Sequence, residues 1–207
     1  MEQFLYGYFQ HATSNFGTQV QGDRLWETIR VQYSQTHRVY HNLNHIYSLV
    51  KDLVPVSSYL KQPDAIYLAA FFHDIVYFPK LKDNELQSAI FARTELEYLS
   101  VPRQVLQLIE SAICATQTHI AGSDTDIAVL IDADLAILGK DAAIYAAYAQ
   151  QIRKEYAHIP EVYYRQGRRK VLERFLARTQ IYSTPFFYQL YETSARTNIL
   201  EECKMLL

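Results

Sequence analysis

The segment from Ile66 to Phe78 places the strongest constraint on the fold, because it is apolar on every face and yet contains an adjacent histidine and aspartate, His73 and Asp74. A helix that is hydrophobic all round belongs in the middle of a globular molecule. Burying an unpaired carboxylate there costs several kcal/mol, comparable with the whole stability of a domain. We therefore expect a divalent metal ion to neutralise Asp74 and to bind His73 as a neutral ligand.

The rest of the chain also predicts helices, because apolar residues recur at three- and four-residue spacing in every long segment. The segments are 23–33, 45–54, 66–78, 85–99, 105–115, 127–138, 144–156, 162–181 and 186–206. Pro63, Pro102, Pro160 and Pro185 stand where a first helical turn would begin, and Gly139 is placed as the residue that follows a helix. We predict a single all-α domain over residues 1–207, with about nine to ten helices.

Composition narrows the class of protein and its partners. The formal net charge of −2 gives no general attraction to nucleic acid or to acidic membranes, so we expect neither as a partner. The two cysteines, Cys114 and Cys203, are isolated, as is typical of a reducing cytosol, and no signal peptide is recognisable at the N-terminus. The longest apolar stretch is too short to span a bilayer. We expect a cytoplasmic protein, and its 17 tyrosines are compatible with a homodimer.

Two further segments offer metal ligands. His41 and His45 are four residues apart, so on a helix they would share one face, and both could approach one ion. Asp134 lies on the apolar stripe of the segment 130–138, which makes it the preferred ligand, with Asp132 as the fallback. Two histidines and two aspartates form a mixed nitrogen and oxygen site. Such a site suits Mn, Fe, Co, Ni or Zn, and suits Mg less well.

These pieces, taken in order, resemble the HD superfamily of metal-dependent phosphohydrolases, whose signature is a His, then His-Asp, then a distant Asp. In detail the chain is similar to the predicted HD phosphohydrolases of bacteria. The matching segments are 40–46, 71–77, Asn84-Glu85 with Ser88-Ala89, 132–139 and 153–196. The Tyr40-His41-Asn42-x-x-His45 motif also resembles one in cyclic-nucleotide phosphodiesterases. The segment Ala115–His119 is one residue shorter than its counterpart in that family.

The resemblance implies hydrolysis of a phosphoester, such as a nucleotide or another small phosphorylated metabolite, with a divalent ion as cofactor. By analogy with the phosphodiesterases, His41 is the general acid and His45 the metal ligand. By analogy with simpler HD enzymes, Arg38-x-x-His41 makes His41 the ligand. Both assignments stay open here, and we favour His45.

The resemblance also implies the remaining roles. The metal ligands are His45, His73, Asp74 and Asp134, and Asp74 accepts the proton of the attacking water as well. Glu85 orients water or holds a second ion. Arg38, His119 and Arg168 hold phosphate oxygens.

Other functions compete with this one. The main alternative is a non-catalytic HD module that binds a nucleotide or a metal for regulation. A di-iron oxygenase would need more histidines between His73 and Asp134 than His119 alone. An RNA-processing role would depend on the C-terminal arginines.

Overall fold

The computed structural model describes residues 1–207, and all of its regular structure is helical. The α-helices are α1 (Glu2–Thr13), α2 (Gln19–Tyr33), α3 (Leu43–Leu53), α4 (Pro63–Phe72), α5 (Asn84–Tyr98), α6 (Arg103–Thr116), α7 (Thr125–Asp134), α8 (Ala142–Glu155), α9 (Glu161–Leu176) and α10 (Pro185–Met205). Two short 3-10 helices are η1 (Val54–Tyr59) and η2 (Leu135–Gly139). The predicted all-α class is confirmed. None of these helices combines the length and the apolar character that crossing a bilayer requires.

The main chain forms two compact units, Met1–Ile131 and Asp132–Leu207, and the division falls within α7. Each unit is described by itself below. The single domain over residues 1–207 stays a prediction.

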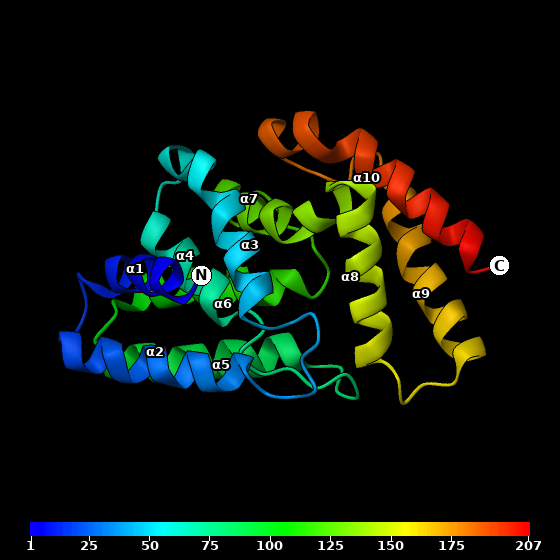
Figure 1. Cartoon of the computed structure of the whole chain (residues 1–207). Coiled ribbons are helices and arrows are strands. Elements are labelled where there is room, and N and C mark those ends of the chain that lie inside the picture. The colour runs from blue at the N-terminus through cyan, green and yellow to red at the C-terminus, as the bar shows by residue number, and fades with distance from the viewer. The chain divides into compact units, whose positions relative to one another are not determined.

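In the first unit, α4 is the central helix, as its all-round apolar sequence predicts. Every residue from Ala65 to Phe72 is buried, and α4 packs against α1, α3, α5 and α6 (Figure 1). Pro63 occupies its first turn, where the missing N–H costs no hydrogen bond. The carboxylate of Asp126 accepts hydrogen bonds from the main-chain N–H groups of Lys61 (2.9 Å) and Gln62 (2.8 Å), directly before the helix.

The expectation that this helix continues to Phe78 is wrong, because α4 ends at Phe72. His73 and Asp74 lie in the turn that follows, and the chain is then irregular until α5 begins at Asn84. Ile75 and Tyr77 are buried in this irregular stretch. Main-chain groups that are buried outside a helix need other hydrogen-bond partners. Side chains from elsewhere in the unit supply them, as described below.

Helix α1 was not among the predicted segments, although its sequence contains a helical pattern. Leu5, Phe9 and Ala12 are spaced four and three residues apart and are fully buried. The polar residues between them, together with the short length of the helix, make this pattern weak when it is read alone.

In the second unit, α10 packs on η2 and α9, and η2 also contacts α8. Gly139, the last residue of η2, does not adopt the left-handed conformation expected of a residue that follows a helix. The glycine is instead required by close packing. A Cβ atom at position 139 would lie 2.4 Å from the Cβ of Tyr191 and 2.8 Å from its carbonyl oxygen.

We predict that Gly139→Ala destabilises the protein by about 1–3 kcal/mol, because the added methyl group meets main chain that cannot move aside easily. The matched control is Gly167→Ala in α9, where an added Cβ finds no atom within 4 Å. That substitution should stabilise the helix by about 0.5–1 kcal/mol. Denaturant unfolding of both variants checks the prediction, and equal stability of the two would contradict it.

Candidate metal centre

His45 is positioned by the start of α3. Asn42 caps this helix, since its Oδ1 accepts a hydrogen bond from the N–H of Asn44 (2.8 Å) and its Nδ2 donates to the carbonyl of Val39 (2.8 Å). His45 therefore lies in the first helical turn, where it is buried. His41 precedes the cap, so the expectation that His41 and His45 share one helix face is wrong. His41 is half-buried, and its ring stacks on the ring of Tyr77 with 4.1 Å between centroids.

His73 is positioned by the end of α4. Its N–H donates to the carbonyl of Ala69 (2.9 Å), and its ring Nδ1 lies 2.9 Å from the carbonyl oxygen of Ala70. A carbonyl oxygen only accepts hydrogen bonds, so Nδ1 must carry a hydrogen. In the neutral imidazole, Nε2 is then left with its lone pair. A metal-binding histidine commonly donates its other ring N–H to a main-chain carbonyl in this way.

Three potential ligand atoms converge at this point, from His45, His73 and Asp74. His73 Nε2 lies 3.1 Å from His45 Nε2 and 3.0 Å from Asp74 Oδ2, and the third separation, between His45 Nε2 and Asp74 Oδ2, is 3.8 Å. Atoms that bind one ion at about 2.1 Å stand about 3.0 Å apart at a right angle and about 3.4 Å apart at the tetrahedral angle. The observed spacing therefore fits a shared ion.

The electrostatics of the cluster favour a cation. Lone pairs on two imidazoles and a carboxylate repel one another at these distances, so a hydrogen or a metal ion must lie among them. It can be the N–H of neutral His45, a proton on His73 Nε2 or a divalent ion. Burial would raise the pKa of the Asp74 carboxyl, but when no metal is bound the positive charges of protonated His73, His41 and His45, with a hydrogen bond from protonated His73 Nε2, outweigh burial. They hold this pKa well below its usual range, so Asp74 stays ionised at neutral pH.

Glu85 lies close enough to the cluster to interact with its charges, and the charge of His119 acts on Glu85. Glu85 is half-buried in the first turn of α5, and its burial raises the pKa of its carboxyl. The negative charge of Asp74 raises this pKa further, while the Glu85 main-chain N–H and the charges of His119 and His73 lower it. His119 follows α6 with a left-handed φ of 52°, which is uncommon for a residue with a side chain.

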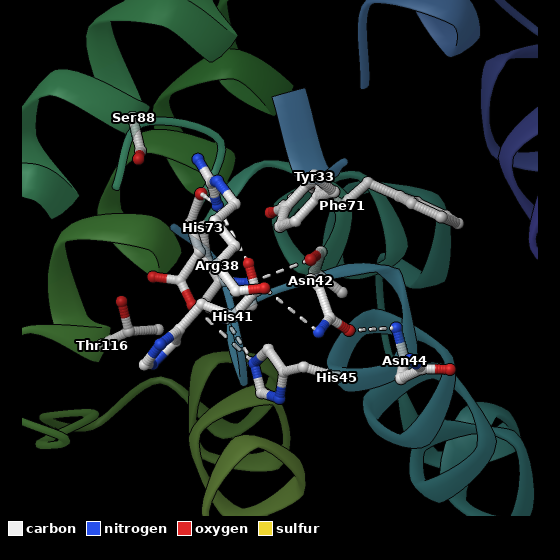
Figure 2. A network of polar contacts seen from close by, with 12 residues as sticks. Tyr33, Arg38, His41, Asn42, Asn44, His45, Phe71, His73, Ser88 and Thr116 are labelled. Atoms are coloured by element: carbon white, nitrogen blue, oxygen red, sulfur yellow. Dashed lines mark hydrogen bonds and ion pairs between the residues drawn. The ribbon is translucent and has the colours of Figure 1, made fainter. Parts of the chain in front are cut away.

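Arg38 contacts main-chain oxygens. It is buried, its Nη1 donates to the carbonyls of Asp74 (2.7 Å) and His41 (3.1 Å), and its Nη2 donates to that of Ile75 (2.8 Å) (Figure 2). Its role as a phosphate-binding residue stays a prediction, and this geometry disfavours it.

Arg168 lies in the second unit and forms a buried ion pair with Glu202, with Nε 2.8 Å from Oε1. Its Nη1 also donates to the hydroxyl of Tyr148 (3.1 Å). These contacts give Arg168 a structural role. Its contact with substrate phosphate stays a prediction.

Asp132 and Asp134, the two candidates for the distant aspartate ligand, differ in their surroundings. Asp132 is fully buried, and its carboxylate accepts hydrogen bonds from the N–H of Ser183 (2.9 Å) and from the N–H (2.6 Å) and hydroxyl (2.7 Å) of Thr184. These bonds hold the chain directly before α10, so Asp132 has a structural role. Asp134 is half-buried at the end of α7 in the second unit, and its place among the ligands stays a prediction.

Ser88 and Asn84, to which the sequence patterns give no role, support the turn after α4. Ser88 Oγ accepts from the N–H of Val76 (3.1 Å) and donates to its carbonyl (3.2 Å). Asn84 makes the equivalent pair of bonds to Phe78, each 3.1 Å long. A signal was available, because Asn84 and Ser88 are small polar residues one helical turn apart. The segments that resemble the HD phosphohydrolases include both.

Comparison with protein-family models, with characterised proteins and with solved structures finds no match for this chain.

We predict that Mn²⁺, Co²⁺ or Zn²⁺ stabilises the native protein, because an ion that binds the cluster binds only the folded state. The gain is about 2.7 kcal/mol when the free ion is at about 100 times its dissociation constant. His73→Ala should abolish this gain. His11→Ala, which removes an exposed histidine from α1 of the same unit, should preserve it. Thermal unfolding with and without each ion provides the measurement, and an unchanged midpoint in wild type would contradict a metal centre.

Proposed function

We propose that this chain is a metal-dependent phosphohydrolase of the HD type, acting on a nucleotide or another small phosphorylated metabolite. One observation carries the proposal. The Nε2 atoms of His45 and His73 and the Asp74 carboxylate converge within 3.0–3.8 Å in a mostly buried cluster that could hold a metal ion. The resemblance of the sequence to HD phosphohydrolases supplies the reaction class.

The ligand set would be His45, His73 and Asp74, all in the first unit. An ion of this kind, when bound, lowers the pKa of a coordinated water and neutralises phosphate charge. The Asp74 side chain retains 13% of its exposure, whereas those of His45 and His73 retain 4% and 2%. A phosphoester and a water molecule would therefore have to reach the ion from the Asp74 side.

The proton transfers fall to the groups around the cluster. We assign to His41 the donation of a proton to the leaving oxygen, and its stacking on Tyr77 and the effect of its charge on Asp74 support this assignment. The sequence resemblance gives the proton of the attacking water to Asp74, but the lowered pKa of Asp74 makes it the weaker base. We therefore assign this proton to Glu85, because its pKa is raised and it lies near Asp74. His119, whose charge also acts on Glu85, could hold a phosphate oxygen.

The first test is phosphate release from a panel of nucleotides and generic phosphoesters with added Mn²⁺. We expect wild type to hydrolyse at least one member and His73→Ala to hydrolyse none, with His11→Ala as the control. If wild type binds Mn²⁺ but releases no phosphate from any member, the hydrolase proposal fails. The regulatory metal- or nucleotide-binding module then becomes the better description.

We further predict that Glu85→Gln lowers kcat by about 10²–10⁴-fold, because the amide cannot accept a proton. Binding of one Mn²⁺ should change little, since Glu85 is not among the three clustered ligands. Activity that depends on ionised Glu85 is lost as the pH falls through its raised pKa, so the variant should also lose that acidic limb of the kcat profile. A variant with wild-type kcat and the same limb would remove Glu85 from the mechanism.

A further inference from the structure

The guanidinium group of Arg38 joins the two chain segments that carry the metal-binding side chains. Its Nη1 donates both to the His41 carbonyl, four residues before His45, and to the Asp74 carbonyl, while its Nη2 donates to the Ile75 carbonyl (Figure 2). The carbonyls of Asp74 and Ile75 lie 36 and 37 residues further along the chain than Arg38. One side chain thus links the start of α3 to the turn after α4.

Aromatic rings hold this guanidinium in place. Its central carbon lies 5.0 Å from the ring centroid of Tyr33 and 5.6 Å from that of Tyr77. Tyr33 also donates its hydroxyl to the carbonyl of Phe71 (3.1 Å), and Tyr77 stacks on His41. The flat, rigid donor fork of arginine suits several fixed carbonyls at once, which the point charge of lysine does not.

We propose that Arg38 is a positioning residue that sets the spacing of His45, His73 and Asp74, and with it the affinity for the metal, and that it does not bind substrate phosphate. The proposal rests on the metal centre of the proposed function. Its physical basis is that the donors on Nη1 and Nη2 already hold carbonyl oxygens at 2.7–3.1 Å. A phosphate would have to break these buried bonds to reach them.

The test measures Mn²⁺ affinity by calorimetry without substrate, in wild type, Arg38→Lys and Arg38→Met. We expect both variants to bind Mn²⁺ about 10–100-fold more weakly, the usual loss when support behind the ligands is removed. The Co²⁺-loaded variants should also show altered visible absorption, because the ligand geometry relaxes. Thermal unfolding without metal identifies any variant that fails to fold. If Arg38→Met does not fold, the Mn²⁺ affinity of Arg38→Lys tests the proposal.

The matched control is Arg153→Lys in the second unit. Arg153 also donates to two carbonyls, those of Tyr156 (2.8 Å) and Ile159 (3.2 Å), and it packs over the ring of Tyr164. Its loss should cost some stability, less than at Arg38 because Arg153 is more exposed, and should leave Mn²⁺ affinity unchanged. A general loosening of the protein would lower the affinity in this variant too, and that result would overturn the proposal.

Other outcomes of the same measurements also test the positioning role of Arg38. Unchanged Mn²⁺ affinity with a raised KM in Arg38→Lys would show that Arg38 binds substrate. Tighter Mn²⁺ binding in Arg38→Met, with no change in Arg38→Lys, would show that only its charge matters. Either result overturns the positioning role while the hydrolase proposal survives. Weaker Mn²⁺ binding in both variants, combined with no hydrolysis by wild type, supports the positioning role and contradicts the hydrolase.

Discussion

Main-chain groups that leave a helix inside a protein must find new hydrogen-bond partners, and the site depends on how this chain meets that requirement after α4. The stretch from Phe71 to Phe78 is mostly buried, and many of its main-chain groups are paired with side chains of other segments. An unpaired buried carbonyl or N–H costs about 1–3 kcal/mol, so a stretch of them would exceed the stability margin of an ordinary domain. The arginine, serine, asparagine and tyrosine that pair with it therefore fix where His73 and Asp74 point.

The same turn concentrates lone pairs where α3 begins. His45 enters from the first turn of that helix, and His73 presents a lone pair because its other ring nitrogen donates to Ala70. The result is a small volume in which a hydrogen or a cation must separate the lone pairs. A single hydrogen bridges two of the three groups, whereas a divalent ion could be bound by all three at once. The capacity to bind a metal ion is in this sense a product of the folding constraint.

Sequence periodicity was sufficient to predict the helical class and the burial of α4, because both follow from where apolar side chains fall along a helix. The histidine and aspartate of the cluster were predicted as well, from the cost of burying Asp74. The end of α4 at Phe72 was not predicted, since the apolar run continues to Phe78 and the interruption depends on distant partners such as Ser88 and Arg38. The requirement for glycine at position 139 arises from contact with Tyr191, which lies 52 residues away along the chain and leaves no local signal.

The bond between His73 and the carbonyl of Ala70 has an evolutionary consequence. Its acceptor belongs to the main chain, so no replacement of the side chain at position 70 can delete it. Substitutions at position 70 therefore do not change which ring nitrogen of His73 carries the hydrogen. The supports built from side chains, those of Arg38, Asn84 and Ser88, have no such protection, and a single codon change can remove each of them. Drift in a lineage that no longer needed the site would be expected to erode these supports first, and to leave a histidine still oriented for an ion it could no longer hold tightly.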